Sequence, residues 1–176
     1  MIPMKVAFVG ESAVGKTSLI KAFMGESIAE VRSTRGVDFY TFTKDNYKIV
    51  VWDFAGQEWF RKAIIDLLKG ASLVVLVFDL SRPETLESLL STWADHITKF
   101  AGKDTTVIVV GNKRDIKKID DETVEKAIDE LKKKINVKFY LQTSALLKEN
   151  VGRLFDMIFE YVKLNEFLAR KKKETL

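Results

Sequence analysis

Short runs of apolar residues alternate along the chain with longer segments in which apolar residues recur every three or four positions. Short runs rich in β-branched residues are typical of strands, and the longer segments are typical of amphipathic helices. The continuous apolar runs 73–78 and 107–110 indicate strands that are covered on both faces. The alternation therefore predicts an α/β fold with a largely parallel sheet.

Six runs qualify as strands, and they cover residues 6–9, 37–42, 48–53, 73–78, 107–110 and 137–141. The turn Lys44-Asp45-Asn46 joins the second run to the third. A parallel pair needs a much longer crossover connection, so this turn predicts an antiparallel hairpin.

The helical segments carry start signals. A first helix is expected over 16–23, directly after a glycine-rich turn. Ser81 precedes Pro83, and proline in the first turn predicts a helix there, with apolar positions at Leu86, Leu89, Leu90, Trp93 and Ile97. Either Asp120 or Asp121 can cap the next helix, and the last begins near Val151. Since no repeat or linker interrupts the pattern, residues 1–176 are expected to form one domain.

The amino-acid composition excludes several classes of functional site. The chain has 176 residues with no cysteine and one histidine, which excludes a disulfide framework, a zinc knuckle and thiol catalysis. Its net charge of +4 (29 basic minus 25 acidic residues) is too small to indicate a specific nucleic-acid partner.

Charge and hydropathy also bear on location. The chain shows no signal peptide, and its longest apolar run, 73–78, is too short to span a membrane, so we expect a cytoplasmic protein. The basic run 170–173 is either a solvated helix end or a site of peripheral membrane association.

The strongest chemical signal lies between the first predicted strand and the first predicted helix. Residues 10–17 read Gly-Glu-Ser-Ala-Val-Gly-Lys-Thr, which satisfies the phosphate-loop pattern G-x-x-x-x-G-K-[ST]. The glycines let successive N–H groups point at one anion, and the helix start adds partial positive charge. Lys16 then reaches the β- and γ-phosphates while the Thr17 hydroxyl ligates Mg²⁺. The residues expected at the phosphates are Gly10, Glu11, Ser12, Ala13, Val14, Gly15, Lys16, Thr17 and Ser18.

A second motif ends the predicted strand 48–53 and reads Asp-Phe-Ala-Gly-Gln over residues 53–57. Asp53 can hold Mg²⁺ through water on the side opposite Thr17. Gly56 offers its N–H to a γ-phosphate without steric obstruction, and Gln57 can orient an attacking water. The phosphate loop alone does not distinguish ATP from GTP, or a switch from a motor protein, and this second motif narrows that choice.

A third motif, Asn112-Lys113-Arg114-Asp115, follows the run 107–110 and selects the base. A carboxylate at Asp115 accepts two hydrogen bonds from guanine N1 and N2, whereas adenine lacks that donor pair and would leave the carboxylate unpaired. The Lys113 stem can lie along the base, and Asn112 can bridge to the phosphate loop. The residues expected around guanine are Asn112, Lys113, Asp115, Ser144, Ala145 and Leu146.

With these motifs in this order and spacing, the chain resembles the Ras superfamily of small GTPases, and its Rab branch most closely. The resemblance runs from Lys5 to about Leu168. Residues 33–39 look like the Rab form of the first switch, and residues 55–70 look like the second switch. The resemblance implies a P-loop NTPase fold with a six-stranded, mostly parallel sheet in the order 2-3-1-4-5-6. Strand 2 would be antiparallel, and about five helices would flank the sheet.

The resemblance also implies a monomeric GTP/GDP switch in signalling or membrane trafficking that binds Mg²⁺ and hydrolyses GTP slowly. The metal ligands would be Thr17, Thr34 and Asp53, with Thr34 bound only in the GTP state. The groups expected around the reacting phosphate are Gln57, Thr34, Gly56 and Lys16. An exchange factor, a GTPase-activating protein and effectors would bind the switch surfaces, about residues 32–42 and 55–70.

Several positions depart from the Rab pattern. Residues 26–31 lack the usual aromatic cover for guanine, so Ile28 is expected to cover the base less well and to let nucleotide leave faster. Trp59 and the pair Leu67-Leu68 replace an arginine and two tyrosines, and the leucines either form a partner surface or pack under the switch. Arg32 is interpreted as a solvated side chain rather than a built-in charge stabiliser.

The chain carries no cysteine for prenylation, so this polypeptide as given lacks a lipid anchor, either through trimming or by nature. Two other functions compete with a GTPase. One is a guanine-nucleotide-binding module with negligible hydrolysis, which the intact Gly56 and Gln57 disfavour. The other is a P-loop kinase for small molecules, which Asp115 and the absence of a recognisable acceptor site and lid disfavour.

Overall fold

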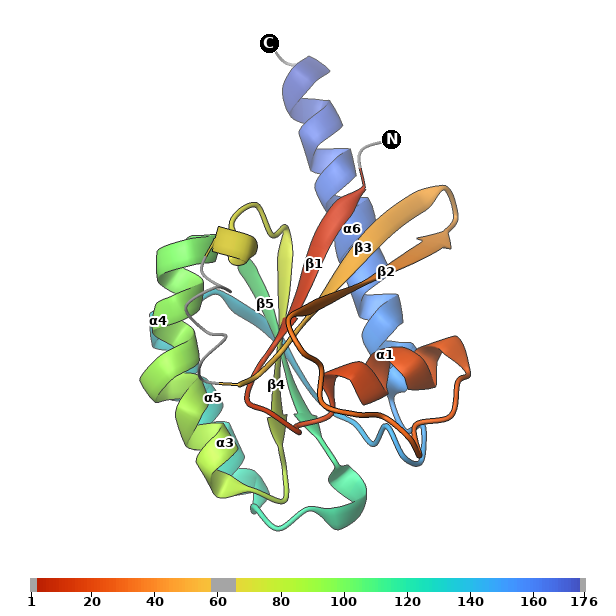
Figure 1. Ribbon diagram of the computed structural model, residues 1–176. Helices are drawn as coiled ribbons and strands as arrows, with labels where there is room; N and C mark the ends of the chain where they lie inside the picture. Colours follow the sequence, from red (N-terminus) through yellow and green to blue (C-terminus); the bar gives the residue numbers. More distant parts are fainter. Residues whose placement is uncertain (1–2, 58–65, 175–176) are drawn as a thin grey trace.

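The computed structural model of the chain describes residues 3–57 and 66–174. Its strands are β1 (Met4–Val9), β2 (Val37–Lys44), β3 (Tyr47–Phe54), β4 (Leu73–Asp79), β5 (Thr106–Asn112) and β6 (Val137–Gln142). They form one sheet in the order β2-β3-β1-β4-β5-β6, in which β2 runs antiparallel to β3 and the other neighbours are parallel (Figure 1). The expected strand order and the predicted hairpin are confirmed.

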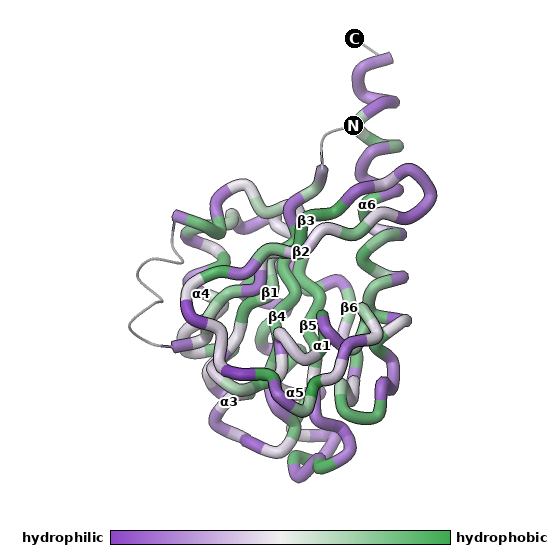
Figure 2. Tube along the Cα trace, turned by 45° about the vertical axis from the view of Figure 1, so that its right-hand side comes forward, coloured by the Kyte–Doolittle hydropathy of each residue, from purple (hydrophilic) through white to green (hydrophobic). Residues whose placement is uncertain are grey.

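Two helical layers sandwich this sheet. The helices α1 (Lys16–Met24) and α6 (Val151–Glu174) cover one face, while the other is covered by α3 (Pro83–Ser88), α4 (Ala94–His96) and α5 (Asp121–Lys134) (Figure 1). Successive side chains of a strand point to opposite faces, so in β1 Ala7 packs toward α3–α5 and Phe8 toward α1 and α6. The strands β4 and β5 are buried along their whole length, which explains their continuous apolar sequence (Figure 2).

Helix boundaries differ from the sequence pattern in one region. The predicted helix after Ser81 consists of α3 and α4 separated and followed by π-helical segments, Leu89–Trp93 and Ile97–Ala101. Arg82 occupies the cap position of α3, directly before Pro83. A π turn contains more residues than an α turn, so residues four apart (Leu89, Trp93 and Ile97) all stay buried against the sheet.

Two terminal features of the helices are well defined. Asp120, not Asp121, caps α5, because its carboxylate accepts a hydrogen bond from the Thr123 N–H at 2.8 Å. At the other end of the chain, α6 extends past the sheet and carries Lys171, Lys172 and Lys173 in its last turn (Figure 1). In residues 3–57 and 66–174, no helix combines the length and the apolar character needed to cross a membrane.

The β2–β3 turn is tighter than predicted. Lys44 still belongs to β2 and pairs with Tyr47, so only Asp45 and Asn46 form the turn. Both have positive φ, 48° and 67°, as in a type I′ turn, which matches the twist of the two strands. Residues other than Gly, Asn and Asp are disfavoured in this left-handed conformation, so a substitution in the turn should change the stability of the protein.

We expect Asn46→Val to lower the free energy of unfolding by about 1–2 kcal/mol, because a β-branched residue would have to adopt a left-handed conformation. Urea denaturation measures the change. Thr43→Val is the matched control, since it introduces valine at an exposed strand position of the same hairpin, where β-branched residues are favoured. Equal losses for the two variants would contradict a role for the turn conformation.

Candidate functional site

The parallel strands β1, β3, β4, β5 and β6 end at the same edge of the sheet, and the predicted motifs follow four of them. The phosphate loop follows β1, the Asp53 motif ends β3, the Asn112 motif ends β5, and residues 143–146 follow β6. Ligands of open α/β sheets bind outside the carboxyl ends of the strands. Residues far apart in the sequence therefore meet in one site.

The phosphate loop depends on close backbone approaches at two glycines. At Gly10, whose φ is 142°, an added Cβ would lie 2.1 Å from the Val77 carbonyl oxygen of β4. At Gly56, a Cβ would lie 2.3 Å from the backbone nitrogen of Ser12, so the second motif rests directly against the loop. Neither position has room for a side chain.

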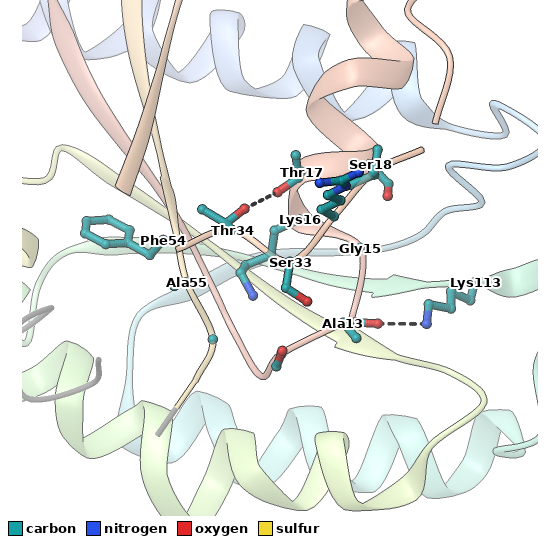
Figure 3. A pocket seen from close by; sticks show the side chains of 14 residues that line it. Ala13, Gly15, Lys16, Thr17, Ser18, Ser33, Thr34, Phe54, Ala55 and Lys113 are labelled. Atoms are coloured by element: carbon teal, nitrogen blue, oxygen red, sulfur yellow. Dashed lines mark hydrogen bonds between the residues drawn. The ribbon is translucent and has the colours of Figure 1, made fainter. Parts of the chain in front are cut away.

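Lys16 begins α1 and is buried under the loop. Its ammonium group donates hydrogen bonds to the carbonyl oxygens of Gly10 at 2.9 Å and Glu11 at 2.7 Å. These bonds hold the cation at the cavity, which has a volume of about 220 Å³ and is lined by Lys16 together with the loop and the first switch (Figure 3). A buried cation beside backbone N–H groups is suited to binding an anion.

Three oxygen-bearing side chains meet beside this cavity. The Thr17 hydroxyl lies 2.7 Å from the Thr34 hydroxyl (Figure 3). It also donates a hydrogen bond to the Asp53 carboxylate. Thr34 comes from the first switch, Thr17 from α1 and Asp53 from the end of β3. Hydroxyl and carboxylate oxygens are the ligands that Mg²⁺ prefers.

The surroundings of the Asp53 carboxyl group do not fully stabilise its negative charge. Burial raises its pKa to about 6, although the Thr17 hydrogen bond and the charge of Lys16 act in the opposite direction. Its Oδ1 atom is buried and has no hydrogen-bond partner. A buried carboxylate with an unsatisfied oxygen is stabilised by a cation, so the donor set fits a bound Mg²⁺.

The base side of the site is held together by Asn112. Its buried amide donates to the Val14 carbonyl at 3.0 Å and accepts from the Thr143 hydroxyl at 3.0 Å and the Ala145 N–H at 3.2 Å. The predicted bridge from Asn112 to the phosphate loop is thus present, and it extends to the loop after β6.

Asp115 and Ser144 lie together at the same place. The Ser144 hydroxyl donates to the Asp115 carboxylate at 2.6 Å, and Asp115 remains exposed. Leu146 follows this pair with 66% of its surface exposed. The carboxylate is therefore oriented by a neighbour while its other oxygen is left for a ligand.

Comparison with known proteins agrees with this geometry. The family model described as "Ras: Ras family" matches residues 5–164 of the chain. This chain belongs to the Ras family. It is 34% identical over 157 residues to "Ras-related protein RABC2a" of Arabidopsis thaliana, covering 86% of this chain and 74% of the relative. It is 33% identical over 172 residues to "Ras-related protein RABA5a" of the same plant, covering 95% of this chain and 76% of the relative.

As a member of the Ras family, this protein is a small GTPase. It hydrolyses GTP and acts as a nucleotide-dependent switch in trafficking or signalling. Members of the family bind GTP and GDP, generally with Mg²⁺. The predicted family resemblance and fold are confirmed. The roles of individual site residues remain predictions.

Not every predicted phosphate residue of this small GTPase contributes a side chain to the cavity. Val14 packs into the core beside α1 and α6, and the Glu11 carboxylate accepts a hydrogen bond from the Trp93 indole at 3.2 Å. These two residues can reach a phosphate only through their backbone. The cavity also includes side chains and backbone that sequence reasoning did not assign to the phosphates, namely Val31, Arg32, Ser33, Phe54, Ala55 and Lys113.

The switch residues of this GTPase lie partly within the described chain. Gln57 borders a groove that adjoins the cavity and includes Thr17 and Thr34, and its Oε1 atom is buried without a hydrogen-bond partner. Arg32 is exposed at the edge of the cavity, and Ile28 packs against the core beneath α1 and α6. Trp59 and the rest of 58–65 lie outside the described residues.

The leucine pair of the second switch packs inward. Leu68 is fully buried and Leu67 is partly buried, and both join the core beneath α3–α5. Lys5 of β1 donates hydrogen bonds to the backbone carbonyls of Leu67 and Lys69, and its ammonium group lies 3.6 Å from the centre of the Trp52 ring. Of the two interpretations, packing under the switch is the one that the structure shows.

Sequence reasoning missed two charged residues behind the phosphate loop. Asp79 is fully buried at the end of β4, and Arg82 follows it at the cap of α3. A weak signal was present, because Asp79 places an acidic residue directly after the apolar run 73–78. A buried charge at a strand end requires a partner, and the sequence does not show which residue supplies it.

Proposed function

We propose that this GTPase is a Rab-like switch that holds GTP or GDP with Mg²⁺ at the carboxyl edge of its sheet and hydrolyses GTP slowly. The observation that carries the proposal is the meeting of Thr17, Thr34 and Asp53 beside the buried Lys16. In this proposal, residues 1–176 form one domain and the protein acts as a monomer.

A small number of groups are proposed to bind the phosphates of the nucleotide. Backbone N–H groups of residues 10–18 and the Lys16 ammonium bind the phosphate oxygens. Thr17, Thr34 and Asp53 would hold Mg²⁺, which would supply positive charge to neutralise the phosphates. Gln57 orients the attacking water, and Gly56 donates its N–H to the γ-phosphate.

The base side selects guanine. The Asp115 carboxylate accepts hydrogen bonds from N1 and N2 of the base, and the Ser144 hydroxyl keeps that carboxylate in place. Asn112 and Lys113 join this side to the phosphate loop, so binding of the base and of the phosphates is coupled. The loop 145–146 completes the base side with the backbone of Ala145 and Leu146.

Nucleotide titrations combined with a single-turnover assay test this proposal. GDP and GTP should bind tightly, and ATP should bind at least about 10³-fold more weakly, because adenine leaves the Asp115 carboxylate unpaired. Bound GTP should release phosphate at about 10⁻⁴–10⁻² s⁻¹. Tight binding without phosphate release would indicate a binding module, and equal competition by ATP would favour a kinase.

Removal of Mg²⁺ should speed the release of GDP by about tenfold or more. Without the divalent cation, Lys16 compensates the negative charges of the buried Asp53 carboxylate and the phosphates less completely, and the remaining repulsion destabilises the complex. Dissociation of a fluorescent GDP analogue with excess EDTA measures the effect, with EDTA preloaded with Mg²⁺ as control. An unchanged rate would count against a metal at Thr17 and Asp53.

Regulators and effectors are proposed to bind residues 32–42 and 55–70. Supporting this, Phe39 on the edge strand β2 is 59% exposed, and its ring lies 4.8 Å from that of Trp52. Contiguous exposed apolar surface is typical of partner-binding sites, and Phe39 together with the partly exposed Trp52 supplies such a patch. The basic last turn of α6 is a second, separate surface, which an anionic membrane could contact.

A further inference from the structure

Two cations from neighbouring strand ends bind successive carbonyl groups of the phosphate loop. Arg82, after β4, donates from Nη2 to the Ser12 carbonyl at 2.8 Å. Lys113, after β5, donates from Nζ to the Ala13 carbonyl at 2.8 Å (Figure 3). Lys113 belongs to the base-binding motif, whereas Arg82 belongs to none of the three motifs. The loop is thus held from behind by a residue 70 positions away.

Asp79 fixes both cations. One of its carboxylate oxygens accepts a hydrogen bond from Arg82 Nε at 3.0 Å and pairs with Lys113 Nζ at 2.7 Å. The other accepts from the Ser81 N–H at 2.8 Å and the Ser81 hydroxyl at 2.6 Å. Burial raises the pKa of the Asp79 carboxyl, but the hydrogen bonds outweigh it and the pKa is lowered, so the group is ionised at neutral pH.

The hydrogen bond from Arg82 to the Ser12 carbonyl sets the orientation of the peptide group between Ser12 and Ala13. The Ser12 carbonyl and the Ala13 N–H belong to one planar trans peptide, so they point in opposite directions. Holding the carbonyl toward Arg82 turns the N–H to the other side. Ala13 has a φ of 60°, a conformation that costs energy for a residue with a Cβ and persists only where neighbours enforce it.

We propose that Arg82 is a positioning residue of the phosphate loop, which orients the Ser12–Ala13 peptide so that its N–H can bind a diphosphate and thereby slows nucleotide release. The inference rests on the proposed function, because it places a nucleoside diphosphate in the cavity. Loss of Arg82 leaves Asp79 bound to Lys113 and Ser81. The effect is therefore confined to the phosphate side.

The test compares Arg82→Ala and Arg82→Gln with Arg153→Ala. Arg153 is an exposed arginine on α6 that belongs to none of the three motifs and does not line the cavity, so the control removes the same charge away from the nucleotide. Both Arg82 variants should release GDP about tenfold faster, the value expected for one lost hydrogen bond to a charged donor. Their affinity for GMP, which lacks the β-phosphate, should stay within about twofold of that of the control.

Equal weakening of GDP and GMP would overturn the inference, because general loosening of the protein would then explain the loss. GDP release matching that of Arg153→Ala would overturn it as well. Backbone hydrogen exchange of residues 11–15 without nucleotide supplies an independent readout, and it should be faster in both Arg82 variants. If the wild type fails to retain GDP, the proposed function falls, and this exchange still decides whether Arg82 positions the loop.

Discussion

Asp115→Asn should weaken binding of GDP by about 10²–10⁴-fold, the loss of two hydrogen bonds to a charged acceptor. The asparagine amide would place a donor against the N–H groups of guanine, so the loss includes an unpaired donor in the site. Xanthine carries a carbonyl oxygen at position 2 and can accept from that amide. The same variant should therefore bind XDP more tightly than the wild type does.

Competition titrations with GDP, XDP and ADP measure this shift. Asp121→Asn is the matched control, because it makes the same chemical change at an exposed carboxylate that contacts Lys117 and Gln142 instead. Its nucleotide preference should equal that of the wild type. If Asp115→Asn left the preference unchanged, guanine selection would have to be reassigned and the kinase alternative would reopen.

Lys16→Met should weaken binding of both GTP and GDP by about 10²–10⁴-fold, the cost of breaking a buried charge pair. Methionine preserves much of the stem that packs under the loop while it removes the positive charge from the phosphates. Unlike Asp115→Asn, this variant should lose XDP and GDP alike, because the affected group contacts no base.

Isothermal calorimetry on nucleotide-free protein measures the loss. Lys126→Met is the control, since Lys126 lies on α5 and pairs with Glu122 at 2.6 Å, away from the phosphate loop and from the cavity lining. The thermal unfolding of the two variants without nucleotide should agree within a few degrees. Nanomolar GDP binding by Lys16→Met would refute the assignment of this lysine to the phosphates.

Local features of this protein could be predicted from the sequence. The phosphate loop is one contiguous stretch, residues 10–17, whose glycines and lysine act within a single turn. The hairpin followed from the short turn Lys44-Asp45-Asn46, although Lys44 itself proved to be part of β2. The order of the six strands came from the family resemblance, because spacing along the chain does not determine which parallel strands pair.

Features that depend on tertiary packing could not be predicted. Leu67 and Leu68 follow each other in sequence, and only the surrounding core shows that both pack inward. The contacts of Arg82 with Ser12 and of Trp93 with Glu11 join residues 70 and 82 positions apart. No periodicity signals such pairs, because each residue alone is compatible with a solvated surface or an ordinary core position.

The close contact of Gly10 with Val77 determines whether folding or nucleotide binding comes first during synthesis of this protein. The nucleotide cavity cannot take shape before β4 has paired with β1, and its base side also needs Asp115 and Ser144 from the second half of the chain. A ribosome must therefore release most of the polypeptide before any nucleotide can bind. Nucleotide then binds only molecules in which these strands have paired, and by mass action bound GDP or GTP favours the folded state over its unfolded precursors.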